Sequence, residues 1–484
     1  MSSLNIDDDI VKLPIVTIQP AFTTVIHEVW SGLIPSDEIW VSRYHHGKDS
    51  IHDRIRVLLD EEDRDKVVWE ATSLGQDGIR LTLEDEGYMV DSTTRLLVPI
   101  QTYLLEEGSS SSTQPRRITS LAISSDQSQF AVGLLDGSAF LYPVVSTTSS
   151  SDREKYAVSQ NVDDQKRKQM LVETQGKKTA HKSTVTALRF FPSSRVLLSA
   201  GADFTMRIWA AEPASPPPPT TTHTTTQMQI QTQIPARTLT AHTRPITSIA
   251  INPLDRGRTV LSGSADGSVR LWNVSTGNEV MERRVRQGGS PVVGVVLDVD
   301  VDSEQKKKPR LYAAIQDGSF EVFEVQLPVP TPDQEEKPSY AERIFKSTRS
   351  VGGALTSIAV SASDSKSKFV ATGSANGIVS IYLNNEEEED YRHLTSFKRN
   401  GASIEGLSFL PQQSSSYSLL AVATSDGLPW IASISPSTSE GASVSVSVYA
   451  ELTGGEIDAV RDVVAIAGEV WTVCDDGVVR RYHI

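Results

Sequence analysis

The chain is poor in several residue types on which whole classes of protein depend. It has one cysteine, Cys474, so it can form no intrachain disulfide, and we expect a reducing compartment, cytoplasmic or nuclear. Lys and Arg number 46 against 61 Asp and Glu, which gives a net charge of −15. This balance argues against nucleic acid as the main partner, because phosphate binding draws on clustered cations. It suits a basic protein partner, or simply solubility.

Long apolar runs and catalytic motifs are also missing. No apolar stretch approaches the ~20 residues that cross a bilayer, and the acidic opening MSSLNIDDDI does not resemble a signal peptide. We therefore expect no membrane association. Phosphate-loop, dinucleotide, zinc-protease and serine-hydrolase motifs are absent. The N-terminal histidines match no zinc spacing and have no cysteine nearby (His27, His45, His46, His52). The sequence thus predicts no enzyme, no metal and no cofactor.

What the sequence does have is a repeat. Seven short segments begin with Asp-Gly or an equivalent pair, at Asp136, Asp203, Asp266, Asp317, Asn376, Asp426 and Asp476. In six of them an aromatic residue follows six positions later (Tyr142, Trp209, Trp272, Phe323, Tyr382, Tyr482). The sixth repeat departs, with Ala432 at that place and Trp430 two residues earlier. Each turn lies between β-branched, alternating segments, which is typical of strands.

Seven strand-rich repeats indicate an all-β protein, a seven-bladed WD40 β-propeller over residues 93–484. Intervals of 50 to 67 residues between turns exceed the usual ~40–45. Polar inserts account for the excess, and we expect 143–180 and 211–236 to be loops because they lack apolar residues. Residues 1–92 do not fit the repeat, and we expect a small β-rich domain there. An eighth blade is the alternative.

Two repeats carry a complete set of hydrogen-bonding side chains at matching offsets. The sets are His181, Ser199, Asp203 and Trp209, and His242, Ser262, Asp266 and Trp272. We interpret both as structural, because such a chain of donors and acceptors satisfies polar groups that burial would otherwise leave unpaired. A catalytic use would require an exposed serine, and no strained elbow exposes one here.

The chain ends on what we expect to be the third strand of the seventh blade. A last blade of four strands would then lack its outer strand. The spare strand-like segment RLLVPIQTYLL, residues 95–105, precedes the first repeat. We predict that 95–105 pairs with 477–484 and closes the ring.

Loops that enter the innermost strands should share one face of the propeller with the Asp-Gly turns. Acidic residues gather there in the last two repeats, and we take Glu405, Glu456, Asp458 and Asp475 as partner-binding candidates. Basic residues are expected elsewhere on that face (Arg116, Arg117, Arg244, Arg349, Arg399). The run EEEED, residues 386–390, is either a solvated loop or an acidic docking element.

Several stretches resemble one family of WD40 proteins. The segment ELTGGEIDAVRDVVAIAGEVWTVCDDGVVRRYHI, residues 451–484, resembles the C-terminus of the proteasomal ATPase-associated factor family. That family shares the E-L-T-G opening, an acidic residue at the place of Asp458, a Cys before the turn and an R-R-Y ending. The segments 185–212, EIWVSR and RLLVPIQTYLL are also similar to it.

The resemblance implies a chaperone for assembly of the proteasome regulatory particle, and we expect the free protein to be a monomer. It would bind the C-terminal domain of an ATPase subunit of the base, escort modules that contain it, and leave the finished particle. The acidic candidates would then contact a basic surface of the ATPase. A ubiquitin-ligase substrate receptor or scaffold is the alternative, since fold alone does not separate the two. Residues 1–92 offer no convincing adaptor-binding helix for it. A propeller hydrolase is disfavoured by the missing motifs.

Overall fold

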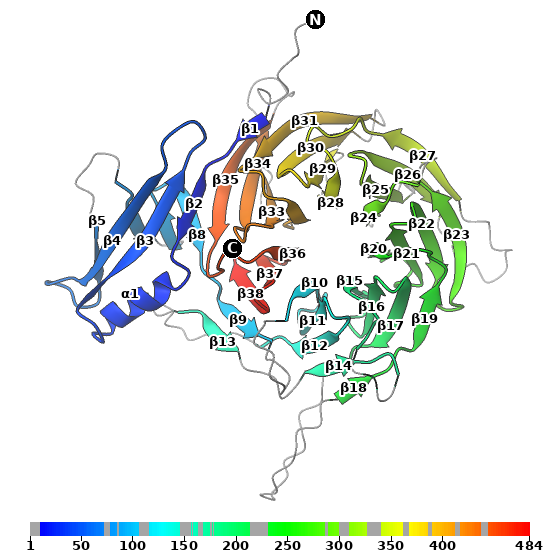
Figure 1. The fold of residues 1–484 in the computed structure, drawn as a ribbon, viewed down its shortest axis with the longest axis horizontal. Coiled ribbons are helices and arrows are strands. Elements are labelled where there is room, and N and C mark those ends of the chain that lie inside the picture. The colour runs from blue at the N-terminus through cyan, green and yellow to red at the C-terminus, as the bar shows by residue number, and fades with distance from the viewer. Residues whose placement is uncertain are drawn as a thin grey trace, which may run out of the picture.

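The structure is a computed structural model of the 484-residue chain. It describes all residues except 1–9, 72–77, 85–86, 106–115, 146–155, 157, 163–167, 175–176, 178, 213–230, 286–288, 300–308, 327–339, 362–366, 386–389, 412–416 and 437–443. Seven of its sheets stand radially around a central opening as the blades of a β-propeller, and an eighth lies at the side of the ring (Figure 1). No helix among the described residues is long and apolar enough to cross a membrane.

The first four blades follow the chain, with the innermost strand of each blade first. Blade 1 contains β10 (Ile118–Ile123), β11 (Gln129–Leu134), β12 (Ala139–Pro143), β14 (Gln169–Leu171) and β18 (Gln231–Gln233). Blade 2 contains β15 (Val185–Phe190), β16 (Val196–Gly201), β17 (Thr205–Ala210) and β19 (Arg237–Thr240). Blade 3 contains β20 (Ile246–Ile251), β21 (Thr259–Ser264), β22 (Ser268–Asn273) and β23 (Asn278–Arg284). Blade 4 contains β24 (Val292–Asp298), β25 (Arg310–Ile315), β26 (Phe320–Gln326) and β27 (Tyr340–Lys346).

The last three blades also take strands from the N-terminal part of the chain. Blade 5 contains β28 (Leu355–Val360), β29 (Ser367–Ser374), β30 (Ile378–Asn385), β31 (Asp390–Lys398) and β1 (Ile10–Lys12). Blade 6 contains β32 (Ile404–Phe409), β33 (Ser418–Thr424), β34 (Trp430–Pro436), β35 (Val444–Leu452), β8 (Thr94–Leu97), β7 (Gly87–Val90) and β6 (Leu81–Glu84). Blade 7 contains β36 (Val460–Ile466), β37 (Glu469–Cys474), β38 (Val478–His483), β9 (Gln101–Leu104) and β13 (Gln160–Val162).

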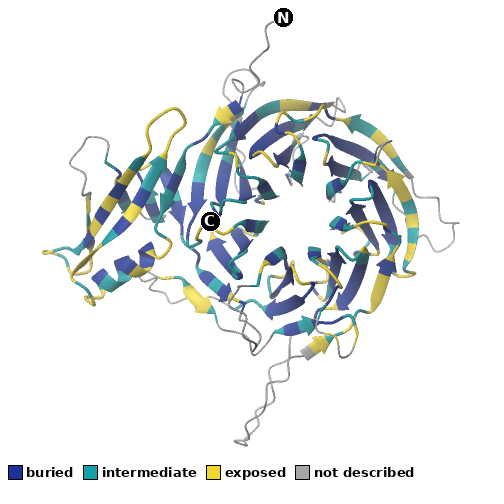
Figure 2. Ribbon diagram, viewed as in Figure 1, coloured by how far each residue is buried: buried dark blue, intermediate teal, exposed yellow. Residues whose placement is uncertain are grey.

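The all-β fold expected from the repeats is what the structure shows. The aromatic residue that ends six of the seven Asp-Gly segments is buried, and Figure 2 shows the buried residues running along the blade strands. The Asp-Gly turn is stabilised by contacts among its own residues. In blade 3 the Asp266 carboxylate accepts the backbone N–H of Ser268 at 2.9 Å, and Gly267 takes a φ of +79°. Glycine adopts such a positive φ without the strain that a Cβ would cause.

The closing strand is shorter than the sequence suggested. β9 pairs antiparallel with β38, from Val478 opposite Leu104 to Arg481 opposite Gln101, and supplies the outer strand of blade 7. The first half of the expected segment pairs elsewhere, because β8 runs parallel to β35 in blade 6. Pro99 lies between the two halves; it has no N–H to donate and a fixed φ, so it interrupts a continuous strand. The expected pairing over 95–105 is therefore wrong for residues 95–97.

The polar inserts are not loops throughout. Within 143–180, β14 forms the fourth strand of blade 1, and β13 lies parallel to β9 at the edge of blade 7. Within 211–236, β18 adds a fifth strand to blade 1. These short strands need few apolar side chains, because open sheet edges supply backbone hydrogen bonds. Tyr156 is also buried, and its hydroxyl accepts a hydrogen bond from the N–H of Val67 at 3.0 Å.

The side unit consists of one sheet and one helix. The sheet contains β2 (Ile15–Ile18), β3 (Ser36–Tyr44), β4 (Ile51–Leu59) and β5 (Val67–Ala71), and α1 (Phe22–Trp30) packs on it. Its apolar core includes Phe22, Ile26, Ile39 and Val57. The unit is joined to the ring on both sides. β1 precedes it on blade 5, and β6, β7 and β8 follow it as an extension of the sheet of blade 6.

Candidate partner-binding face

The Asp-Gly turns and the loops that enter the next blade lie on one face of the propeller, which we call the turn face. In blade 1 the carbonyl of Gly137 accepts the N–H groups of Ala180 and His181, both at 3.0 Å. In blade 4 the carbonyl of Gly318 accepts the N–H of Ser350 at 2.6 Å. Each turn thus holds the loop that enters its neighbour, and the candidate residues of both kinds share this face.

In blade 2 the four polar side chains form one buried chain of hydrogen bonds. His181 Nδ1 donates to Asp203 at 2.9 Å, and Ser199 Oγ donates to His181 Nε2 at 2.7 Å. Trp209 Nε1 donates to Ser199 Oγ at 2.8 Å. The tautomer follows from the acceptors, because an ionised carboxylate can only accept.

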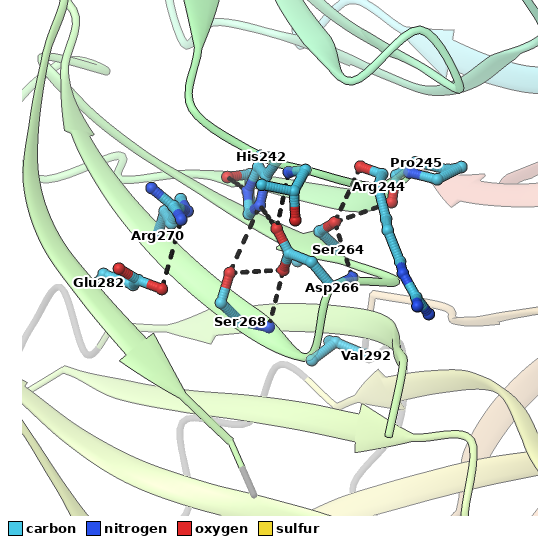
Figure 3. Close-up of polar contacts among 12 residues, drawn as sticks. His242, Arg244, Pro245, Ser264, Asp266, Ser268, Arg270, Glu282 and Val292 are labelled. Carbon is cyan, nitrogen blue, oxygen red and sulfur yellow. Dashed lines mark hydrogen bonds and ion pairs between the residues drawn. The ribbon is translucent and has the colours of Figure 1, made fainter. Parts of the chain in front are cut away.

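Blade 3 has the same arrangement, and Figure 3 shows His242 and Ser268 beside Asp266. His242 Nδ1 lies 2.8 Å from Asp266, and His242 Nε2 lies 2.7 Å from Ser262 Oγ. Trp272 Nε1 donates to Ser262 Oγ at 2.9 Å. Burial lowers the pKa of His242 despite the facing carboxylate. Burial opposes ionisation of Asp266, but hydrogen bonds from Ser268 and His242 outweigh it and lower its pKa to about 2.

These sets hold the blades together. Ser199 and Ser262 are fully buried, and each hydroxyl already bonds to an imidazole and an indole. A nucleophilic serine needs an accessible hydroxyl, so the arrangement stabilises the fold and offers no site for substrate.

Blade 6 departs from this arrangement where the sequence does. Asn400 takes the place of the histidine, and its Nδ2 donates to Asp426 Oδ2 at 2.6 Å. Asp426 Oδ1 accepts the N–H of Leu428 at 3.1 Å. Trp430 is buried and the cation of Arg399 lies 5.0 Å from its ring centre. A pocket opens beside these residues on the turn face.

The loop from Glu456 to Asp458, which we call the acidic loop, is an exposed charged segment between blades 6 and 7. All three residues are exposed, and Ile457 between the acids is 86% exposed. Its backbone lies against the turn of blade 6, because a Cβ added to Gly427 would come within 2.6 Å of the Glu456 carbonyl oxygen. The backbone of the loop is therefore packed against blade 6, while its residues are exposed to solvent.

Side chains from the end of the chain support this loop. The thiol of Cys474 lies 2.9 Å from the carbonyl oxygen of Asp458, and Arg480 Nε donates to the Gly454 carbonyl at 3.0 Å. The hydroxyl of Tyr482 donates to the Thr453 carbonyl at 2.8 Å. Burial raises the pKa of the Cys474 thiol to about 12, so it is an unreactive structural group. The T-G, Cys and R-R-Y features of residues 451–484 therefore act together to position the acidic loop.

The other two acidic candidates are already paired. Arg461 Nη1 lies 3.2 Å from Glu405, and its Nε and Nη2 lie 3.0 and 2.8 Å from the two oxygens of Asp475. Hydrogen bonding to Asp475 raises the pKa of this guanidinium. The structure brings Glu405 and Asp475 together around one cation, which offsets much of their charge. The net acidic character of the sector therefore rests on Glu456 and Asp458.

The basic candidates also divide into two groups. Arg117, Arg244 and Arg349 are exposed, and Arg244 extends away from the Asp266 cluster (Figure 3). Arg399 lines the pocket of blade 6 on this face, but its side chain is only 5% exposed and so offers little charge to a partner. It makes a two-pronged ion pair with Glu451, at 2.9 and 2.5 Å, and its Nε donates to the Pro14 carbonyl. It joins the N-terminal segment to blades 5 and 6, because burial of a guanidinium requires a paired carboxylate.

No metal site is present in the part of the chain that the structure describes, where no three His, Cys, Asp or Glu side chains gather. His46 lies beside Lys12, and His52 beside Ser42. Most of the acidic run 386–390 lies outside the described residues.

Sequence reasoning missed three features of this face. Arg461 neutralises the candidates Glu405 and Asp475. Its position at the start of an innermost strand, directly before Asp462, was visible in the sequence. Ile457 is an apolar residue between two exposed acids, and that pattern was visible. The pocket of blade 6 was signalled by Ala432 and Trp430, although its existence depends on tertiary packing.

Comparison with known proteins is consistent with this architecture. Residues 173–210 and 233–273, which include blade 2 and the three inner strands of blade 3, match the family described as "WD domain, G-beta repeat". The chain is 35% identical over 79 residues to "26S proteasome regulatory subunit RPN14" of Saccharomyces cerevisiae (strain ATCC 204508 / S288c). That match covers 16% of this chain and 14% of the relative's length. The chain therefore contains WD40 repeats on a β-propeller, a fold that typically serves as a non-enzymatic platform for protein–protein interaction.

Proposed function

We propose that the protein is an assembly chaperone of the proteasome regulatory particle. It binds the C-terminal domain of an ATPase subunit of the base through the turn face of its propeller. The observation that carries the proposal is the acidic loop, because it is exposed, rigidly supported and not neutralised by a neighbouring cation among the described residues. The similarity to a proteasome regulatory subunit over 79 residues supports the choice of partner.

The chemistry of the loop sets the chemistry of the partner surface. Glu456 and Asp458 present two carboxylates on either side of the exposed Ile457. A basic surface with an apolar contact complements this arrangement. Exposed charges mainly speed association and fix orientation, whereas buried apolar contacts slow dissociation. Binding should therefore weaken as salt rises, since exposed charges are screened within about 8 Å at physiological ionic strength.

The bound propeller would hinder docking of the ATPase on the proteasome core particle until the chaperone leaves. The side unit adds to the bulk of the ring, because β1 before it pairs with blade 5 and β8 after it pairs with blade 6. Equal affinity of the protein for intact capped proteasomes and for the free base would overturn this steric role. The role places the protein in the cytoplasm and nucleus, where proteasomes assemble.

Affinity purification separates this function from a ubiquitin-ligase receptor. The tagged full-length chain is recovered from cell extract, and bound proteins are identified by mass spectrometry. Regulatory-particle ATPases without core-particle subunits are the expected result. Recovery of ligase adaptors without those ATPases would overturn the proposal. The variant Glu456→Lys/Asp458→Lys is purified in parallel, and it should recover less of the ATPases if the acidic loop binds them.

A further inference from the structure

The turn of blade 2 carries a phenylalanine where the other six turns have glycine. Those glycines follow the Asp or Asn of the turn and have φ values between +76° and +95°. Phe204 has the same left-handed backbone conformation, with a φ of +69°. Such a φ is unusual for a bulky residue, because it brings Cβ close to the following carbonyl oxygen. The backbone at Phe204 is therefore strained.

The hydrogen bonds of this turn do not require a phenylalanine. The Asp203 carboxylate accepts the N–H and the hydroxyl of Thr205, at 3.2 and 2.8 Å. The Phe204 N–H donates to the Gly201 carbonyl at 3.2 Å. The turn of blade 3 makes the same three contacts with a glycine at its second position. A glycine in blade 2 would keep them with less strain.

The glycines of the other turns allow the loop of the next blade to approach closely. A Cβ added to Gly137, Gly318, Gly377 or Gly427 would come within 3.0 Å of a carbonyl oxygen in that loop. Phe204 has a Cβ, so the loop that enters blade 3 cannot approach the turn of blade 2 in this way. Blade 2 gives up a close backbone contact and carries an aromatic side chain instead.

The ring of Phe204 is exposed next to a second apolar side chain. Phe204 is 41% exposed, and Leu135, at the turn of blade 1, is 49% exposed. Thr184 lies between the two turns. Its hydroxyl donates to the Leu135 carbonyl at 3.0 Å, and its carbonyl accepts the N–H of Ala202, two residues before Phe204, at 2.8 Å. Leu135 and Phe204, which we call the apolar pair, thus expose apolar surface on the turn face.

Cations stand near the apolar pair. Arg117, Lys182 and Arg244 are exposed in the loops that enter blades 1, 2 and 3. The Arg117 carbonyl accepts the Leu135 N–H at 3.1 Å, and the Lys182 N–H donates to the carboxylate of the blade 2 turn at 3.0 Å. Arg244 follows β19, which pairs with the strand directly after Phe204.

The acids nearby are mostly paired with other groups. Glu173 and Asp203 lie 3.1 and 3.5 Å from the buried Arg207. Asp136 is exposed, and its carboxylate accepts the Ser138 N–H at 2.8 Å. Among the residues named around the apolar pair, three exposed cations thus stand against one exposed acid. This side of the turn face is basic, in contrast with the acidic loop.

We propose that the apolar pair binds an acidic segment of the partner protein. An apolar side chain of that segment packs on the Phe204 ring, and its carboxylates lie near Arg117, Lys182 and Arg244. Strained backbone persists where the side chain that it presents has a function, and an exposed aromatic ring is a frequent anchor of protein interfaces. The inference rests on the proposed function for the identity of the partner.

The positions of the two contacts constrain that partner. Blade 2 lies across the central opening from blade 6, next to which the acidic loop lies (Figure 1). A partner that contacts both must span the opening, so it is a folded domain and not a short peptide. It presents a basic surface to the acidic loop and an acidic one to the apolar pair, and this polarity fixes its orientation on the face.

Calorimetric titration of the full-length protein with an isolated ATPase C-terminal domain tests the role of the ring. Phe204→Gly and Phe204→Ala both remove it and should weaken binding about fivefold to tenfold, the loss expected for one anchor side chain. The control Leu254→Ala truncates a side chain that is 51% exposed between β20 and β21, on the opposite face, and should change affinity by less than about twofold. Unchanged affinity in both Phe204 variants would overturn the proposal.

Urea unfolding of the same variants separates binding from a structural role. Phe204→Gly restores the residue of the other turns and relieves the strain, so its urea midpoint should not fall below that of the wild type. Phe204→Ala keeps the Cβ and the strained φ, and its midpoint should be lower. A lower midpoint for Phe204→Gly together with unchanged affinity would show that the ring serves the fold, and the proposal would be wrong.

Charge reversal tests the acidic character of the partner segment. Arg117→Glu/Arg244→Glu should weaken binding, more so at low salt. The control Arg195→Glu/Arg258→Glu makes the same charge change at exposed residues of the opposite face and should have little effect. Tighter binding by the first variant would mean that a basic surface lies here, against the proposal. Binding of oligouridine that Phe204→Gly abolishes would assign the apolar pair to nucleic acid instead.

The titration also separates this proposal from the proposed function. If the wild type binds none of the regulatory-particle ATPase domains, the proposed function is wrong, and this contact with it. If reversal of the acidic loop weakens binding while Phe204→Gly binds as the wild type does, the function stands and this contact alone is wrong. Weaker binding by both variants supports a partner that spans the opening.

Discussion

Blades 2 and 6 have different side chains at equivalent positions, and their hydrogen bonding differs as a result. In blade 2 the side chains of His181, Ser199, Asp203 and Trp209 form one continuous chain of hydrogen bonds, and His181, Ser199 and Trp209 are buried. In blade 6 an amide replaces the imidazole, Asp426 keeps fewer donors, and a pocket opens to the turn face. A repeat that keeps its hydrogen-bonded set contributes to stability. In blade 6, where the set is lost, fewer hydrogen bonds hold the turn.

The largest expected difference is in the cost of removing the aspartate. Asp203→Ala leaves the His181 ring and the Thr205 hydroxyl without their acceptor, and should lower the free energy of unfolding by about 3 kcal/mol. Asp426→Ala removes an acceptor from fewer donors and should cost about 1 kcal/mol. Urea unfolding followed by tryptophan fluorescence measures both. Equal losses of unfolding free energy would show that the two clusters contribute equally to stability.

A second pair of variants compares a bonded hydroxyl with an unbonded one. Ser199→Ala leaves Trp209 Nε1 and His181 Nε2 without a partner and should cost about 2 kcal/mol. Thr424→Val removes a buried hydroxyl that has no partner among the described residues, so the unfolding free energy should stay the same or rise slightly. The same urea titration measures both. A clear loss with Thr424→Val would mean that its hydroxyl has a stabilising contact.

The pH dependence of stability reports on the buried histidines of blades 2 and 3. Burial lowers the pKa of His181 and His242 in the folded state, so below about pH 6.5 the unfolded chain binds protons that the folded chain does not. Stability should therefore fall as pH drops from 7 to 5, by up to about 1.4 kcal/mol per pH unit for each histidine. The lowered pKa values of Asp203 and Asp266 add a further loss below about pH 4.

Adding a histidine to blade 6 sharpens this comparison. Asn400→His/Thr424→Ser should make the loss between pH 7 and 5 steeper, because the new imidazole would be buried beside Asp426. Urea midpoints at pH 7, 6 and 5 give the slope for both proteins. An unchanged slope would mean that the new side chain stays in solvent and leaves the pocket open.

Much of the architecture followed from local signals. Asp-Gly pairs and the aromatic residue six positions later mark the turns and inner strands, since both depend on residue type and spacing alone. The two hydrogen-bonded sets were visible for the same reason. The closing segment was assigned only in part, because Pro99 divides it and its first half finds an open edge on blade 6. Edge pairing of short polar segments such as 169–171 depends on which edges remain open.

The site was less accessible to sequence reasoning. Glu456 and Asp458 could be chosen because they lie in a loop that enters an innermost strand. The pairing of Glu405 and Asp475 through Arg461 could not, since it joins residues 56 and 14 positions apart in sequence. The burial of Arg399 likewise depends on Glu451 and on the N-terminal segment.

The affinity of the protein for an isolated ATPase C-terminal domain tests the central claim most directly. Calorimetric titration at low salt compares the wild type, Glu456→Lys/Asp458→Lys, and the control Glu62→Lys/Asp65→Lys, which makes the same charge change at exposed residues of the side unit. Reversal of the acidic loop should weaken binding by about tenfold or more, and the control by less than about twofold. Equal weakening by both, or none by the first, would contradict the claim that the acidic loop binds the ATPase.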